Sequence, residues 1–238
     1  MWVTAFLDFP VHAYDAGVSF WAAATGSTVS PPRGDHGEFG TLLPPDGDPY
    51  LRVQRLGAGP TRVHLDLHDP TLKDRAIAHG ARLIAEDDYA TLASPSGLVF
   101  CVVSESLSRR PMIGDLVLDQ VCIDVAEHAF GDEFEFWERL LDREGDDDGG
   151  QFAHLPRTPD EPLRVMLQRC GPGPTKAHLD FAATDRDASV RWLVGLGATE
   201  VRRTTDWTTL RDPAGLEFCV TDREPGTGRL PAASATPL

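Results

Sequence analysis

The chain has few basic residues and no long apolar stretches, and both absences argue against particular classes of protein. Its 238 residues include 22 lysine and arginine residues against 37 aspartate and glutamate residues, which gives a formal net charge of −15 at pH 7. Nucleic acids and anionic membranes are bound through basic surfaces that release counterions, so we expect neither as a partner. No apolar run reaches the length that a membrane-spanning helix requires.

Secretion signals and paired cysteines are also scarce. The first ten residues are apolar, but they include Asp8 and lack a basic flank, which favours a first strand over a signal peptide. The four cysteines, Cys101, Cys122, Cys170 and Cys219, show no Cys-x-x-Cys spacing, so we expect free thiols. Together these absences predict a cytoplasmic globular protein.

The most informative feature of the sequence is an internal repeat. GPGPTKAHLDF at 171–181 matches GAGPTRVHLDL at 57–67 at seven of eleven positions, and aligns the pair His64 and Asp66 with His178 and Asp180. Further matches connect Phe20-Trp21 to Phe136-Trp137 and residues 95–102 to 213–220. The chain is therefore duplicated, and each half is long enough to be a domain.

Apolar periodicity predicts the same order of elements twice in each half: strand, helix, then three strands. One helix pattern, over 129–142, places Phe130, Phe134, Trp137 and Leu141 on a single apolar stripe. We predict domains at 1–108 and 115–222, a linker at 109–114, and a flexible tail at 223–238, where Pro, Gly, Ala, Ser and Thr predominate.

Four such modules, ending in a hairpin that carries Asp212-Pro213 and Gly215, resemble the vicinal oxygen chelate superfamily. This superfamily includes glyoxalase, the bleomycin-resistance proteins and extradiol dioxygenases. The likeness covers about residues 2–222 and is greatest for double-domain glyoxalase-like proteins, whose strands carry the HLDL signature seen at 64–67. It implies an α+β fold in which four βαβββ modules form two open-barrel, cup-like domains, with ligands in each concavity.

Alternation along the strands then assigns residues to faces. Val63, Leu65 and Leu67 should face a covering helix, while the residues between them face the cup. By the same parity and by their place in the repeat, the candidate ligand-binding residues are His64, Asp66, Arg62, Lys176, Gln54, Gln168, Gln120, Tyr89, Trp207 and Cys219. Cys122 and Asp124 should lie beside Gln120 on the same face.

Metal-dependent members of the superfamily take ligands from the first strand of each module and from the last strand. The resemblance places Thr4, Arg62 and Cys101 at those positions in the first half, and Gln120, Lys176 and Cys219 in the second. Because cationic Arg62 and Lys176 would repel a divalent ion, we expect neither a metal at these positions nor another cofactor.

Two functions stay open. The first is metal-independent binding of a small cationic or aromatic molecule, as in the bleomycin-resistance relatives. The second is a glyoxalase-like lyase or isomerase with His178, Asp180 and Glu217 as catalytic residues. In that enzyme His178 and Asp180 act as acid and base, or His178 holds a shifted metal with Glu217 and Gln120.

Each His-x-Asp pair could equally belong to a hydrogen-bond network that lines or braces a cup. One half could also serve only to complete the fold of the other. Since one chain carries four modules, both a monomer and a homodimer are compatible with the sequence.

Overall fold

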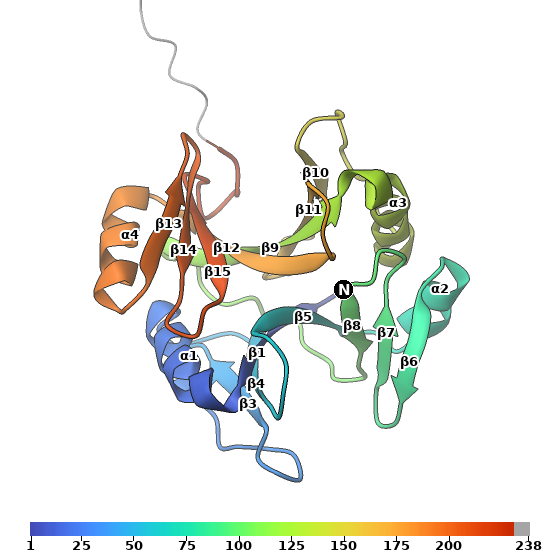
Figure 1. The fold of residues 1–238 in the computed structure, drawn as a ribbon, viewed down its shortest axis with the longest axis horizontal. Helices are drawn as coiled ribbons and strands as arrows, with labels where there is room; N and C mark the ends of the chain where they lie inside the picture. The colour runs from blue at the N-terminus through green and yellow to red at the C-terminus, as the bar shows by residue number, and fades with distance from the viewer. Residues whose placement is uncertain (231–238) are drawn as a thin grey trace, which may run out of the picture.

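The computed structural model describes residues 1–230, and its two halves form two mixed β-sheets (Figure 1). The first sheet, in the order β2-β3-β4-β1-β5-β8-β7-β6, consists of β1 (Val3–Pro10), β2 (Thr28–Val29), β3 (Phe39–Leu43), β4 (Leu51–Leu56), β5 (Arg62–Leu67), β6 (Arg82–Glu86), β7 (Ala90–Ala93) and β8 (Val99–Val102). The second, in the order β10-β11-β9-β12-β15-β14-β13, consists of β9 (Leu116–Ala126), β10 (Phe152–Leu155), β11 (Arg164–Cys170), β12 (Lys176–Ala183), β13 (Thr199–Arg203), β14 (Trp207–Arg211) and β15 (Glu217–Thr221).

Each sheet joins two modules through their first strands. β1 and β5 pair antiparallel at the centre of the first sheet, as β9 and β12 do in the second. The neighbours outside each central pair run parallel to it: β4 beside β1 and β8 beside β5, then β11 beside β9 and β15 beside β12. Modules therefore pair within a half, which the sequence left open, and the predicted α+β fold with two unclosed sheets is confirmed.

The third module departs from the predicted order of elements. Between its helix and β10 the acidic stretch 144–150 forms no strand, and a single bridge from Asp146 to His154 stands where β2 stands in the first module. Closely spaced aspartates and glycines disfavour an extended ladder, so this module has two strands after its helix.

Within residues 1–230, four α-helices and a short 3-10 helix cover the sheets: α1 (Val11–Ala24), α2 (Leu72–Ala78), η1 (Glu127–Ala129), α3 (Phe130–Leu141) and α4 (Arg186–Gly195). The stripe predicted for α3 is confirmed, because Phe130, Phe134, Trp137 and Leu141 are all buried. None of the helices in residues 1–230 is long and apolar enough to cross a membrane.

The helices α1 and α3 pack across the boundary between the halves. Trp21 of α1 stacks on Phe181 of β12 and meets Phe218 of β15 edge-on, with ring centroids 5.9 and 5.2 Å apart. In the equivalent position, Trp137 of α3 lies 5.5 Å from Phe100 of β8. Figure 1 shows this exchange of helices between the halves: α1 lies beside the second sheet, and α3 lies beside α2 and the first sheet.

Each of these buried indoles donates its N–H to one carboxylate, but the carboxylate comes from a different place in each half. Trp21 Nε1 donates to Asp212 Oδ2 at 2.7 Å, from the β14–β15 turn. Trp137 Nε1 donates to Glu133 Oε1 at 2.8 Å, on its own helix, and Glu133 Oε2 accepts from Ser96 N of the β7–β8 turn at 2.9 Å. In the repeat, Glu133 corresponds to Gly17.

The start of the predicted tail packs against the second half. Arg223, the first residue of the predicted tail, is buried, and its Nη2 lies 2.7 Å from Asp119 Oδ1. The packed chain thus extends beyond residue 222 because this ion pair holds it to β9. Residues 224–230 are also described, and the last part of the predicted tail, 231–238, lies outside the described residues.

Candidate functional site

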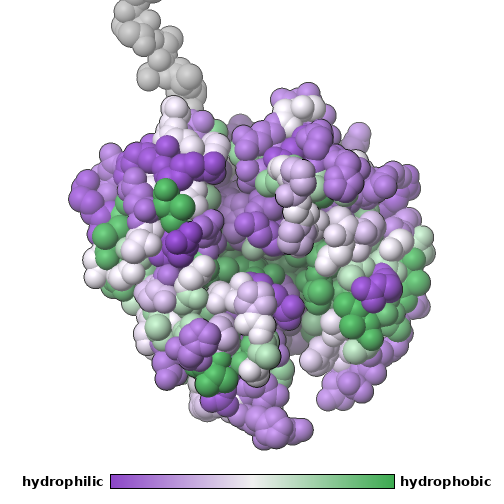
Figure 2. Space-filling model, in the orientation of Figure 1, coloured by the Kyte–Doolittle hydropathy of each residue, from purple (hydrophilic) through white to green (hydrophobic). Residues whose placement is uncertain are grey.

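The face of each sheet opposite the core is hollowed. The first-half hollow measures about 330 Å³, and the second half has an outer hollow of about 520 Å³ and an inner one of about 250 Å³. The inner and outer hollows share Gln168, His178, Trp207 and Cys219. Figure 2 shows the molecule recessed between its upper lobes, which belong to the second half, and notched between its lower lobes, which belong to the first.

Strand parity is confirmed for both copies of the repeated motif. Arg62, His64 and Asp66 line the first-half hollow, whereas Val63, Leu65 and Leu67 belong to the core. In the second half, Lys176 and His178 line the outer hollow, and His178 and Asp180 line the inner one. The remaining candidates follow the same division: Gln54, Tyr89 and Cys101 line the first-half hollow, and Gln120, Gln168, Trp207 and Cys219 line the second-half hollows.

In the second half, His178 lies between two carboxylates. Its Nδ1 is 3.3 Å from Asp124 Oδ2 and its Nε2 is 3.3 Å from Asp180 Oδ1. Asp180 Oδ2 also accepts a hydrogen bond from Gln120 Nε2 at 2.6 Å. These contacts join β9 and β12 in one polar network, which is how buried polar groups are normally satisfied.

The network favours a charged imidazolium and a charged carboxylate. Burial alone would lower the pKa of His178, but Cys122, Asp180 and the hydrogen bonds to Asp124 and Asp180 raise it well above its usual value. Burial would raise the pKa of Asp180, but His178, Arg223 and Gln120 together lower it. A histidine that holds its proton between two carboxylates is a poor general base at neutral pH, since it has no free lone pair.

The first half repeats this arrangement more loosely. His64 Nδ1 lies 2.9 Å from Asp8 Oδ2, while His64 Nε2 lies 3.7 Å from Asp66 Oδ1. The His64 ring stacks on Phe6 with centroids 4.6 Å apart. Burial raises the pKa of Asp66, and the attraction of His64 and Arg52 only partly opposes this. Thr4, in place of Gln120, binds His68 instead of the aspartate.

In the described part of the chain, two groups of side chains have ligand atoms close enough to share a metal ion. His64, Asp66 and Cys101 form one, and Cys122, His178 and Asp180 form the other, with the ligand atoms of each group within 4.8 Å of one another. The thiol comes from β8 in the first group and from β9 in the second. Burial raises the pKa of both Cys101 and Cys122 to about 12, so a metal would have to displace their protons.

The strand register shows which side chains lie between the outer members of each ligand set that the resemblance suggested. Asp66 is the cross-strand partner of both Thr4 and Cys101, and Asp180 is the partner of both Gln120 and Cys219. The middle position of each row is therefore an aspartate. Arg62 and Lys176 lie four residues away along the same strands, where they pair with Asp8 and Asp124 and their side chains are 49% and 64% exposed.

Glu217 does not join the second group. Its Oε1 accepts from Arg211 Nη2 at 2.6 Å on the neighbouring strand, and it lines only the outer hollow. The shifted centre predicted from His178, Glu217 and Gln120 is therefore not assembled. Glu217 is half-exposed, so its pairing with an arginine beside it satisfies the carboxylate without a metal.

Sequence reasoning missed two arginines of the first-half hollow. Arg52 lies two residues before Gln54 on β4, so the parity that selected Gln54 would have found it. Arg33 lies in the loop before β3, and only the bridge between Arg33 and Phe39 brings it to the hollow. Loop residues placed by a single long-range bridge leave no periodic signal.

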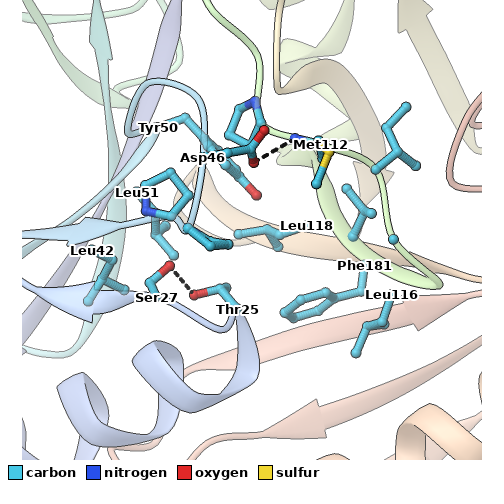
Figure 3. Close-up of a pocket in the computed structure, with 16 residues that line it drawn as sticks. Thr25, Ser27, Leu42, Asp46, Tyr50, Leu51, Met112, Leu116, Leu118 and Phe181 are labelled. Carbon is cyan, nitrogen blue, oxygen red and sulfur yellow. Dashed lines mark hydrogen bonds between the residues drawn. The ribbon is translucent and has the colours of Figure 1, made fainter.

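A further hollow of about 280 Å³ lies at the boundary between the halves, next to the predicted linker (Figure 3). Leucines and prolines predominate in its lining. Asp46 Oδ1 accepts from Met112 N at 3.0 Å, and Asp48 Oδ2 accepts from Ser108 N and Arg109 N at 2.9 and 2.8 Å. The β3–β4 turn thus fixes the connecting segment to the first half.

Comparisons with known proteins agree with this architecture. The model of the glyoxalase-like domain matches twice, at residues 4–103 and 120–221. The chain belongs to the glyoxalase-like domain family. The two matches confirm the internal repeat and the resemblance to the vicinal oxygen chelate superfamily. A search of curated proteins finds no match to this glyoxalase-like protein.

Solved structures share the fold at low sequence identity. A mutant of 4-hydroxymandelate synthase from Streptomyces coelicolor is 17% identical, with a TM-score of 0.61 over 92% of this chain and 91% of that one. An Mn(II)-bound glyoxalase from Novosphingobium aromaticivorans is 16% identical, with a TM-score of 0.62 over 97% and 87%. A catechol 2,3-dioxygenase is 16% identical, with a TM-score of 0.60 over 92% and 87%.

Proposed function

We propose that this glyoxalase-like protein binds a small organic molecule in the hollow of a sheet, without using a metal to hold it. The observation that supports this most is the Asp-His-Asp arrangement in each half: each nitrogen of His178 lies 3.3 Å from a carboxylate oxygen, and the His64 ring is fixed by Asp8 and Phe6. Such a preorganised polar wall beside aromatic side chains suits a ligand more than proton transfer.

A matched pair of variants tests this proposal. Gln54 and Gln168 are repeat counterparts that line the first-half and second-half hollows, so Gln54→Trp and Gln168→Trp each fill one of them. A library of anionic, neutral and cationic fragments would be screened by ligand-observed NMR against the wild type and both variants. We expect hits that one variant abolishes and the other retains. Hits that survive both substitutions, or no hits at all, would refute binding in the hollows.

The alternative is a metal-assisted lyase or isomerase in the second half, favoured by the group of Cys122, His178 and Asp180. Thiolate, imidazole and carboxylate are ligand types that zinc accepts, and the Oδ1 atom of Asp180 is buried without a hydrogen-bond partner among the described residues. A divalent ion held there would act as a Lewis acid toward a substrate oxygen. Around it, Gln120 would orient Asp180 through its amide.

Elemental mass spectrometry of the protein purified without a chelator distinguishes the two. Near-stoichiometric zinc, iron, manganese or nickel that is lost in Cys122→Ser but kept in Cys101→Ser would favour the enzyme and its second-half centre. Metal at trace level in all three proteins would favour metal-independent binding. Each hollow is formed by one chain, so we propose that binding requires no second copy.

A further inference from the structure

The first-half hollow carries a concentration of guanidinium groups that is unexpected in so acidic a chain. Arg33, Arg52 and Arg62 reach it from three separate elements, and Asp66 is the one acidic residue among the described residues that line it. An overall charge of −15 would lead one to expect a cationic ligand, but the local charge of this lining is of the opposite sign. Local charge governs the contacts that a bound molecule makes.

Each of these arginines is held in place by one contact and keeps other N–H donors. Arg33 Nη1 donates to Thr41 Oγ1 at 2.8 Å, and Arg62 Nε donates to Asp8 Oδ2 at 2.8 Å. A guanidinium has five N–H donors, so a single hydrogen bond leaves most of them available to a planar oxyanion.

Arg52 lies deepest of the three. Its side chain is only 12% exposed, Glu105 contacts it from the more exposed side, and its Nε is buried without a hydrogen-bond partner among residues 1–230. A buried donor without an acceptor is costly, which makes this N–H a position where a ligand oxygen would be stabilised.

Aromatic rings line the same hollow. Phe6 stacks on His64, Phe39 meets Phe6 edge-on with centroids 6.3 Å apart, and the half-exposed Tyr89 stands at the rim. The Arg52 guanidinium lies 5.9 Å from the Phe6 centroid, so charge and ring surface are adjacent. The hollow of about 330 Å³ is at the small end of ligand sites, which excludes large ligands.

The second half distributes these groups differently. Its outer hollow is lined by Arg62, Arg202, Arg211 and Lys176 beside Trp207, with Asp124 and Glu217 as acidic counterparts. The repeat counterpart of Arg52 is Met166, and that of Phe6 is Cys122. The inner hollow there is lined by Met166, Cys219 and His178, with Phe152 edge-on to Trp207, and by Arg223 as its one arginine among the described residues. The two cups have therefore diverged in chemistry while keeping the same Asp-His-Asp frame. The first half places a largely buried guanidinium, that of Arg52, beside the stacked Phe6 and His64 rings, whereas Met166 and Cys122 occupy the positions of Arg52 and Phe6 in the second.

Resting on the proposed binding function, we infer that the first-half hollow binds a small aromatic carboxylate, with Arg52 as its principal anchor. The carboxylate would accept from Arg52, with Arg33 and Arg62 on either side, and the ring of the ligand would lie against Phe6 and Tyr89.

Three probes of nearly equal shape test the sign of the charge. Benzoate, benzamide and benzamidine carry charges of −1, 0 and +1 on the same ring. We expect benzoate to bind with a Kd at least tenfold below that of benzamide, and benzamidine to bind no more tightly than benzamide. Raising the salt from about 20 to about 200 mM should weaken benzoate several-fold and leave benzamide nearly unchanged.

Variants then locate the site. Arg52→Met, which installs the residue of the other half, should weaken benzoate at least tenfold while changing benzamide less than about twofold. Arg52→Lys keeps the charge without the planar fork and should weaken benzoate about three- to tenfold, which gives a second reading if the methionine variant folds poorly. Arg203→Met, at an exposed ion pair on the edge strand β13, is the matched control and should change neither ligand.

The outcomes separate this inference from the proposed function. Tighter binding of benzamide or benzamidine in the first-half hollow would overturn the carboxylate assignment and leave small-molecule binding intact. Equal losses of benzoate and benzamide in Arg52→Met would show that Arg52 contributes shape and not charge, which also overturns it. Binding of none of the three probes would overturn it as well, while the fragment screen with Gln54→Trp and Gln168→Trp would still decide the binding function.

Discussion

The hydrogen bond between Trp21 and Asp212 should contribute a large part of the stability that joins the two halves. It connects residues 191 positions apart, and both side chains are buried. Asp212 Oδ1 also accepts from Ala214 N and Leu216 N, both at 2.8 Å, so Asp212→Ala removes three hydrogen bonds to one carboxylate.

The magnitude follows from which groups lose their partners. A buried indole N–H without an acceptor costs about 1–3 kcal/mol, and hydrogen bonds to charged groups contribute about 1.5–3 kcal/mol each, partly offset by the cost of burying the carboxylate. The two turn amides can recover water. We therefore expect Asp212→Ala to lower the free energy of unfolding by about 3–5 kcal/mol. For a chain of this size that corresponds to a fall in Tm of roughly 6–20 °C.

Urea denaturation followed by tryptophan fluorescence and by circular dichroism measures this loss, and a double-mutant cycle assigns it. Trp21→Phe keeps a buried ring and removes the N–H, so Asp212→Ala should cost about 1–3 kcal/mol less in that background than in the wild type. Additivity of the two substitutions within about 0.5 kcal/mol would refute the reasoning. Glu133→Ala, at the carboxylate that serves Trp137, provides the comparison in the other half.

Three further predictions concern other parts of the molecule. The His178–Asp180 pair should stabilise the protein within a defined pH range. Because the pKa of His178 is raised, its contribution to stability is fully present below about pH 6.5 and is lost as the pH rises through the folded-state pKa of His178. Because the pKa of Asp180 is lowered, its contribution is present above about pH 3.8 and is lost as the pH falls through the folded-state pKa of Asp180. The difference in unfolding free energy between the wild type and His178→Asn should therefore be larger at about pH 5.5 than at about pH 10, and an unchanged difference would contradict the charged pair. Gly17→Ala should destabilise the protein by about 1–2 kcal/mol, because the added Cβ would lie 2.7 Å from the buried Phe9 ring. Gly131→Ala adds a Cβ that meets no neighbouring atom within 4 Å, so it should stabilise the protein by roughly 0.5 kcal/mol. Thermal melts of the two variants should therefore shift in opposite directions. Because burial raises the pKa of Cys101 and Cys122 to about 12, these thiols should react slowly with a disulfide reagent at about pH 8. Fast reaction of Cys101 or Cys122 before urea is added would contradict this burial.

The features that depend on local periodicity could be predicted from the sequence. Alternation in β5 and β12 assigned His64 and His178 to the concave face correctly, and the spacing of Phe130 and Trp137 identified the buried face of α3. Both results need only the geometry of one element, which neighbouring residues determine.

Features that depend on register or on distant partners could not be predicted. The row of Gln120, Asp180 and Cys219 depends on how three strands align, whereas the sequence alone led us to group Lys176 with Gln120 and Cys219. Glu217 was selected by its type, but its strand neighbour Arg211 determines what it binds. No periodic pattern indicates that α1 packs on the second sheet, because its contacts lie far along the chain.

Trp21 and Trp137 take their carboxylate acceptors from different places, and this difference affects which halves can pair. If two first halves associated through this boundary, each Trp21 would face Gly17 and Ser94, the counterparts of Glu133 and Asp212, and would lose its carboxylate acceptor. If two second halves associated, each Trp137 would face Glu133 and Asp212 together, which buries two carboxylates against one donor. One first half joined to one second half gives each indole a single acceptor. The boundary thus distinguishes unlike halves from like ones, and after duplication neither half retains a well-matched copy of itself as a partner.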